Sequence, residues 1–101
     1  MYRFMRKTTL KNGAYTPLAM GFATEVVGYL NKSYGINLQC GMEMFDSCTI
    51  HWHFDTDSLE KISDVNMKLM QDKGYWAMLD KVKDIWVNGS VKDSVVMLAK
   101  N

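Results

Sequence analysis

The sequence CTIHWHF at residues 48–54 alternates between apolar and polar side chains with a period of two. Isoleucine, tryptophan and phenylalanine occupy the even positions, whereas Thr49, His51 and His53 occupy the odd ones. Because a β-strand turns successive side chains to opposite faces, this pattern predicts the central strand of a half-buried sheet. Both histidines of the chain then lie on one face, two residues apart.

The preceding residues 37–45 alternate in the same way and predict a second strand, with Asp46-Ser47 as the turn between the two. A two-residue turn would place methionines opposite histidines. The hydrophobic pattern instead favours an odd-length connection or a bulge, because a slip of one residue moves every side chain to the other face. The predicted register pairs Met44 with Ile50, Glu43 with His51 and Gly41 with His53.

A first helix is predicted over residues 16–34. Thr16 suits the N-cap, the proline after it suits the first helical position, and Gly35 suits the left-handed residue that ends a helix. Gly21 and Gly28 would permit close approach of a strand, a partner helix or a ligand. The predicted apolar stripe consists of Met20, Ala23, Val27, Leu30 and Tyr34.

A second helical region is predicted from Asp57, whose carboxylate can cap the helix while Glu60 reaches back three residues later. Lys73-Gly74 divides this region into two segments, and Asn88-Gly89 ends the second one. The predicted buried stripes are Leu59, Ile62, Val65 and Leu69, then Tyr75, Met78, Leu79, Val82, Ile85 and Trp86.

Residues 2–9 predict a first strand with Tyr2 and Phe4 on one face, and residues 94–100 predict a fourth. The complete order is β-α-β-β-α-β, the split βαβ arrangement of ferredoxin-like domains, within one domain over residues 1–101. Its four-stranded antiparallel sheet carries helices on one face only. The other face must therefore be covered by a partner or wetted.

This order and these element lengths resemble the dimeric α+β barrel superfamily, which includes antibiotic-biosynthesis-monooxygenase-like and NIPSNAP-like domains. The run Ser58-Leu59-Glu60-Lys61, followed by Leu69, Asp72 and Tyr75-Trp76, is similar to the second helix of NIPSNAP-type domains. The resemblance implies a homodimer in which two sheets pack face to face and enclose a pocket in each subunit. It also implies, as one option, a cofactor-independent monooxygenase-like enzyme, but no motif here carries over a catalytic residue.

Composition narrows the choice of partners. Twelve Lys and Arg against eleven Asp and Glu give a net charge of +1, which argues against binding of nucleic acid through phosphate neutralisation. RNA-recognition domains share the element order, but their basic and aromatic RNP1 run is missing here. The sequence has no signal peptide and no apolar run long enough for a bilayer, so we expect a cytoplasmic protein without a membrane partner.

The candidate site follows from the histidine face of the 48–54 strand. Polar groups that converge in an apolar concavity are typical of a small-molecule site, so we expect a small apolar or aromatic ligand and no cofactor. His51, tuned by Glu43, is the candidate general base, and His53 is the candidate for orienting a substrate oxygen. The candidate ligand-binding residues are Gln39, Thr49 and Trp76, although an aromatic residue at helical spacing also suits the core.

Other interpretations stay open at this point. The polar side chains could instead hydrogen-bond within a dimer interface or to water and serve only packing. A metal site would need three or four protein ligands, and only His51, His53 and Glu43 offer themselves. A non-catalytic ligand-binding or interaction module fits the sequence as well as an enzyme does.

Overall fold

A computed structural model describes the chain except for residues 44, 46, 100 and 101. Its elements are β1 (Tyr2–Thr9), the 3-10 turn η1 (Gly13–Tyr15), α1 (Thr16–Tyr34), β2 (Gln39–Met42), β3 (Thr49–Thr56), α2 (Leu59–Leu69), α3 (Lys73–Asp80) and β4 (Lys92–Met97). The strands form one antiparallel sheet in the order β2-β3-β1-β4. The predicted α+β order is confirmed, with the second helix divided into α2 and α3.

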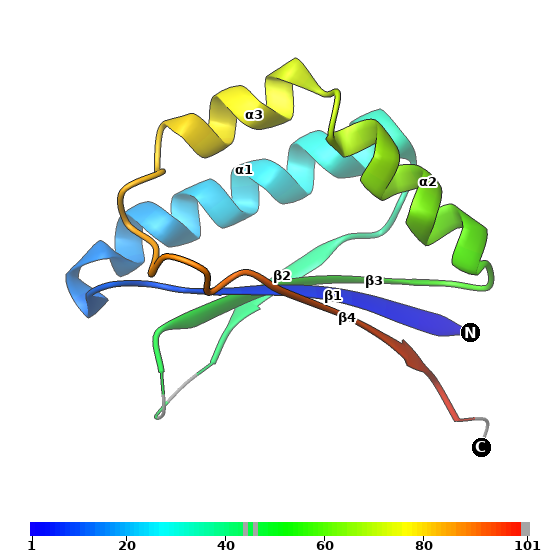
Figure 1. Cartoon of the computed structure of the whole chain (residues 1–101), viewed down its shortest axis with the longest axis horizontal. Coiled ribbons are helices and arrows are strands. Elements are labelled where there is room, and N and C mark those ends of the chain that lie inside the picture. The colour runs from blue at the N-terminus through cyan, green and yellow to red at the C-terminus, as the bar shows by residue number, and fades with distance from the viewer. Residues whose placement is uncertain (44, 46, 100–101) are drawn as a thin grey trace.

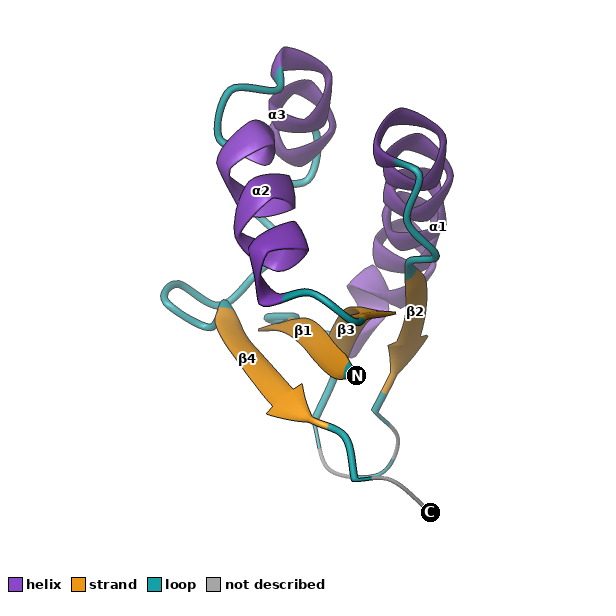
Figure 2. Cartoon of the chain, turned by 90° about the vertical axis from the view of Figure 1, so that its right-hand side faces the viewer, coloured by secondary structure: helices purple, strands orange, loops and turns teal. Residues whose placement is uncertain are grey.

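All three α-helices lie on one side of the sheet (Figures 1 and 2), which we call the helix face. In β3, Ile50, Trp52 and Phe54 are buried on this face, as the alternation predicted. His51 and His53 lie half-buried on the opposite side, which we call the open face. The aromatic residues of β3 are thus covered by helices and offer no exposed platform on which bases could stack.

The β2–β3 hairpin pairs like faces, as predicted, but its register is shifted by two residues. The observed pairs are Gln39 with His53, Gly41 with His51, Cys40 with Trp52 and Met42 with Ile50. The predicted pairing of Glu43 with His51, and of Gly41 with His53, is therefore wrong. Glu43 lies nearer the turn, where its N–H donates to the carbonyl of Thr49 at 2.8 Å.

The physical reason is that any shift by an even number of residues satisfies the same hydrophobic pattern. The pattern sets the face of each side chain but not its partner along the strand. The position along the strand depends on the connection, in which Phe45 adopts a left-handed φ of 78°. Met44 and Asp46, which the predicted register and turn included, lie outside the described residues.

Helix α1 begins at Thr16, but Thr16 is not its N-cap, contrary to the prediction. The Thr16 hydroxyl donates to the carbonyl of Gly13 at 2.6 Å, and Tyr15 occupies the cap position without a side-chain bond. The helix grows directly out of η1, whose Gly13 carbonyl also accepts from the Thr16 amide. Gly35 ends the helix with a left-handed φ of 62°, as predicted.

The buried stripe of α1 differs in part from the predicted one. It consists of Ala19, Phe22, Ala23, Val26 and Leu30. Met20, Val27 and Tyr34 lie at its border, partly buried against the core. Several neighbouring rows of α1 are apolar, and packing against the sheet selects the central one. A Cβ at Gly21 or Gly28 would meet nothing within 4 Å, so neither glycine serves close packing within the described chain.

Helix α2 begins one residue later than predicted. Ser58, not Asp57, is its N-cap, and the Ser58 hydroxyl accepts the Lys61 amide at 3.2 Å. Ile62, Val65 and Leu69 are buried as predicted, whereas Leu59 is 53% exposed. Leu59 is the first residue of α2 and does not belong to the core cluster.

The predicted break between two helical segments is present, but it precedes Gly74, which lies in the first turn of α3. A Cβ at Gly74 would collide with the hydroxyl of Tyr29, which explains the glycine. Helix α3 ends at Asp80 and does not continue to Trp86. Val82 and Ile85 in the following turns are nevertheless buried.

Strand β4 begins two residues before the predicted start at Ser94. It is an edge strand, and all six of its residues are exposed. Lys100, the predicted end, is outside the described residues. Within the described part of the chain, no helix is both long and apolar enough to cross a bilayer.

Candidate functional site

A cavity of about 370 Å³ lies on the helix face, between the sheet and the helices. We call it the helix-side pocket. Its lining consists of Phe4, Arg6, Thr8, Phe22, Val26, Leu30, Ile36, Leu38, Trp52, Phe54, Val65, Asn66, Leu69, Tyr75, Trp76, Leu79, Trp86 and Val91. In Figure 2, α1 stands on one side above the sheet and α2 and α3 on the other, and the pocket takes side chains from both sides. Its size and aromatic lining are those of a small-molecule site.

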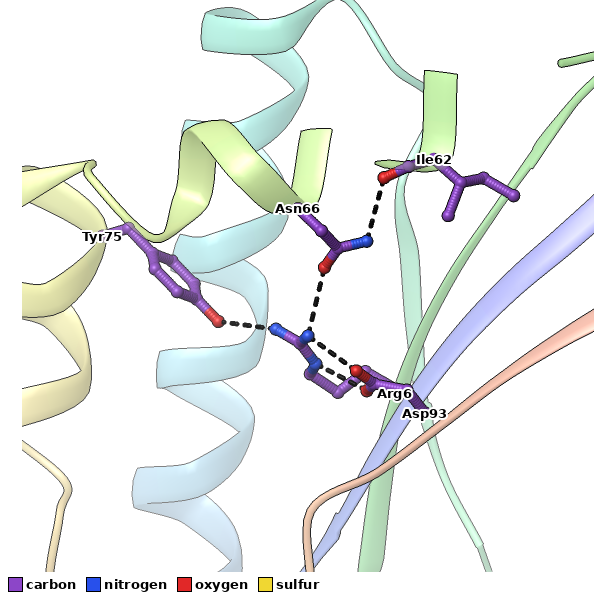
Figure 3. Close-up of polar contacts among 5 residues, drawn as sticks. All are labelled: Arg6, Ile62, Asn66, Tyr75 and Asp93. Atoms are coloured by element: carbon purple, nitrogen blue, oxygen red, sulfur yellow. Dashed lines mark hydrogen bonds and ion pairs between the residues drawn. The ribbon is translucent and has the colours of Figure 1, made fainter. Parts of the chain in front are cut away.

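Arg6 is the charged side chain of this lining, and four hydrogen bonds hold it (Figure 3). Its Nε and Nη2 donate to the two carboxylate oxygens of Asp93 at 2.7 and 2.8 Å. Nη2 also donates to Asn66 Oδ1 at 3.1 Å, and Nη1 donates to the hydroxyl of Tyr75 at 3.3 Å. The bond to Asp93 raises the pKa of Arg6 against the effect of burial, so the guanidinium stays charged.

Asn66 and Tyr75 are fixed by their own surroundings. Asn66 Nδ2 donates to the carbonyl of Ile62 at 3.0 Å, which turns the amide oxygen toward Arg6. The Tyr75 hydroxyl accepts from Arg6, and its own proton has no acceptor among the bonds of the described residues. One polar end of the pocket therefore offers a free O–H donor beside a guanidinium.

A second cluster holds α3 over the pocket. The Asp72 carboxylate accepts the hydroxyls of Tyr29 and Tyr34 from α1 and also the backbone N–H of Tyr75. Burial, followed by the bond to Asp72, raises the pKa of Tyr34 to about 12, whereas the Tyr34 bond lowers the pKa of Asp72. Asp72 is thus ionised and both tyrosines are protonated at neutral pH, which keeps the α1–α3 contact closed.

The predicted site lies on the other side of the sheet. The rings of His51 and His53 are 5.5 Å apart, and Gln39 lies opposite His53. Glu43 does not bond His51; its Oε1 accepts from Lys7 at 2.9 Å, and Lys7 lies opposite His51 in β1. Burial, the His53 charge and the Lys7 charge lower the pKa of His51, while Glu43 acts in the opposite direction.

His53 lines a smaller pocket of about 130 Å³ on the open face, together with Arg3, Asn37, Gln39, Phe54 and Asp55. Its Nδ1 is buried and has no hydrogen-bond partner within the described residues. Thr49 is buried at the end of β3, where its hydroxyl bonds Thr9 at 3.0 Å and Ser47 at 2.7 Å. Those bonds tie Thr49 to β1 and to the β2–β3 connection.

The structure therefore brings Gln39, His51 and His53 together and separates them from Trp76. Trp76 lies on α3, lines the helix-side pocket and is 51% exposed, so it is a pocket wall but not one shared with the histidines. Among the described residues, no group of three or more His, Cys, Asp or Glu side chains is placed to hold a metal ion.

Sequence reasoning missed Arg6, Asn66 and Asp93. A signal existed for Arg6, because it shares the even-numbered face of β1 with Tyr2 and Phe4, and a charge on an apolar strand face needs a partner. Asp93 could not be found in this way, since it lies just before the predicted fourth strand, and its pairing with Arg6 is a tertiary contact.

The sequence matches no protein-family profile and no curated protein. Solved structures do share its fold. A NIPSNAP family protein of unknown function from Agrobacterium tumefaciens has a TM-score of 0.79 at 19% identity, covering 99% of this chain and 89% of that one. A proposed antibiotic biosynthesis monooxygenase from Deinococcus radiodurans has a TM-score of 0.71 at 9% identity, covering 100% and 95%.

A dimeric protein of unknown function from Bacteroides fragilis, described as having a ferredoxin-like fold, has a TM-score of 0.70 at 12% identity, covering 96% of this chain and 95% of that one. The chain thus resembles NIPSNAP proteins and proposed monooxygenases over its whole length. At these identities the likeness establishes the fold, and the protein has the ferredoxin-like α+β fold.

Proposed function

We propose that the protein binds a small, flat, largely apolar molecule in the helix-side pocket, with one oxygen atom directed at Tyr75 and Arg6. A single observation carries this proposal: an aromatic-lined cavity of about 370 Å³ has two oriented polar donors at one end. Apolar walls supply most of the affinity of such sites, and a few placed polar groups fix the orientation of the ligand.

The three tryptophans of the chain provide the test, because Trp52, Trp76 and Trp86 all line the helix-side pocket. Titration with 1-naphthol should produce a saturable change in tryptophan fluorescence with a dissociation constant of roughly micromolar order. Val65→Phe should fill the cavity and weaken binding at least about tenfold, because it takes up space that the ligand needs.

The matched control is Val96→Phe, the same substitution on an exposed residue of β4 that is absent from the pocket lining. It should leave the titration unchanged. A folded wild-type protein that shows no saturable response up to about 1 mM naphthol would refute the proposal, since that affinity is too weak for a built site.

Self-association through the open face belongs to the same proposal. One structural neighbour is described as dimeric, and the open face of this chain carries half-buried side chains without a covering layer in the described residues. Two sheets packed face to face would cover Met5, His51 and His53. Light scattering on a sizing column should then give twice the 11.6 kDa mass of the chain.

A second site is favoured by the buried, unpaired Nδ1 of His53 beside the 130 Å³ pocket. In a face-to-face dimer, His51, His53 and Gln39 would line an intersheet space in which His51 acts as general base, with Glu43 acting on it through charge. Thr49 would contribute only at the edge. Replacing His51 and His53 with glutamine should leave naphthol binding unchanged if this site is separate from the helix-side pocket.

A further inference from the structure

Two arginine–aspartate pairs cross the sheet with nearly the same geometry but on opposite faces. Arg6 and Asp93 lie opposite each other in β1 and β4 and share two bonds, of 2.7 and 2.8 Å. Arg3 and Asp55 lie opposite each other in β1 and β3 and share bonds of 2.8 and 3.1 Å. Arg6 lines the helix-side pocket, whereas Arg3 does not. The pairs thus share their bond geometry, whereas Arg6 is more buried and has two further partners, Tyr75 and Asn66.

Asp93 reaches Arg6 from outside the pocket. It is on the exposed edge strand β4 and is not part of the lining, and it occupies the Nε and Nη2 side of the guanidinium. The Nη1 side is left toward Tyr75. Asp93 therefore takes no space from a ligand, but it places a negative charge within hydrogen-bond distance of the cation that the ligand would meet.

We infer that Asp93 determines the charge selectivity of the helix-side pocket, so that neutral oxygen-bearing ligands are accepted and carboxylates are rejected. The inference rests on the proposed function. A carboxylate that leaves water for an apolar cavity needs an uncompensated cation to offset the lost hydration. The positive charge of Arg6 is already balanced by the carboxylate of Asp93, which also repels an incoming anion. A neutral hydroxyl or carbonyl needs only the hydrogen bonds of Tyr75 and Arg6.

The experiment compares two probes that share the naphthalene ring and differ in its substituent, 1-naphthol and 1-naphthoate, at neutral pH by tryptophan fluorescence and calorimetry. Wild-type protein should bind naphthol at least about tenfold more tightly than naphthoate. Asp93→Asn keeps the size of the side chain and an acceptor for Arg6 but removes the charge. It should tighten naphthoate binding about tenfold and leave naphthol within about twofold.

Asp55→Asn is the matched control, because it removes the same charge from the equivalent pair on the open face. It should leave the ratio of the two affinities unchanged. The gain of naphthoate binding in Asp93→Asn should also shrink as salt is added, since it depends on an uncompensated charge. Asp93→Ser serves as a second variant with the same expected shift if the asparagine protein does not fold.

The outcomes separate the inference from the proposal beneath it. If wild type binds naphthol but the ratio of naphthol to naphthoate affinity is the same in Asp93→Asn, the proposed pocket is supported. The role of Asp93 in charge selectivity is then refuted. Equal affinity of the wild-type protein for naphthol and naphthoate also refutes the role of Asp93 in charge selectivity. If wild-type protein binds neither probe, the proposed function fails and the inference fails with it.

Discussion

The two faces of the sheet carry chemically different surfaces made by the same strands. On the helix face, apolar side chains surround a cavity, and Arg6 is held by four hydrogen bonds. On the open face, His51 and His53 lie beside exposed ion pairs and a much smaller pocket. The position of the two histidines therefore does not predict which face carries the larger of these two cavities. Coverage by helices decides that.

The largest expected effect tests which face is the core. Trp52→Ala should lower the free energy of unfolding by about 3–5 kcal/mol, because the buried indole leaves a cavity and loses its bond to the Ala23 carbonyl. Denaturant titration measures the loss. His53→Ala, one residue away on the open face, should cost clearly less. Equal losses for the two variants would mean that the faces do not differ in packing.

A smaller difference in stability is expected between variants of two carboxylates, Asp72 and Glu43. Asp72→Ala removes a helix cap and two tyrosine bonds, so we expect a loss of about 2 kcal/mol in unfolding free energy. Glu43→Ala removes a single exposed contact with Lys7 and should change stability by less than about 1 kcal/mol. Losses of the same size would show that the α1–α3 contact contributes little.

The two arginine–aspartate pairs allow the same comparison between the helix face and the open face. Arg6→Met should lower stability by about 1 kcal/mol, because Tyr75 and Asn66 lose their partner near the pocket. Arg3→Met on the open face should have a smaller effect, since solvent replaces its contacts. Thermal unfolding of both variants measures the difference. A more damaging Arg3→Met would contradict a larger role for Arg6, which is the more buried of the two arginines.

The smallest effect is the pH dependence on the open face. The folded pKa of His51 lies below its ordinary 6.5, mainly because of burial. As pH falls below about 6.5, the unfolded chain takes up the proton first, so stability is full above that pH and is lost through the lower folded pKa. Melting temperatures between pH 7.5 and 5 should fall less steeply in His51→Gln than in wild type. Identical slopes would exclude His51 as the cause.

Much of the fold could be predicted because it depends on local periodicity. The alternation in β3 assigned the buried and exposed sides of Ile50, Trp52, His51 and His53 correctly. Gly35 marked the end of α1, and the break between α2 and α3 fell close to Gly74. These signals work because strand pleating, helix periodicity and the left-handed glycine are properties of a short segment.

The candidate site was predicted less well. His51, His53 and Gln39 do share one face, but Glu43 bonds Lys7, the Thr49 hydroxyl is bonded to Thr9 of β1, and Trp76 lines the opposite side. Whether the open face forms a site stays a prediction. The register error had a defined origin, since an even shift conserves the face of every side chain while changing each cross-strand partner.

The sequence by itself determined the order of elements and the face on which Ile50, Trp52, His51 and His53 of β3 lie, because both follow from interactions within a few residues. Only the tertiary structure decided which residues meet. Arg6 bonds Asp93, which is 87 positions away in the sequence, and it also bonds Tyr75, which is 69 positions away. No local pattern encodes such contacts. The Arg6–Asp93 pair forms when β4 aligns beside β1, whereas the Tyr75 bond forms when α3 packs over the sheet. That packing also creates the pocket.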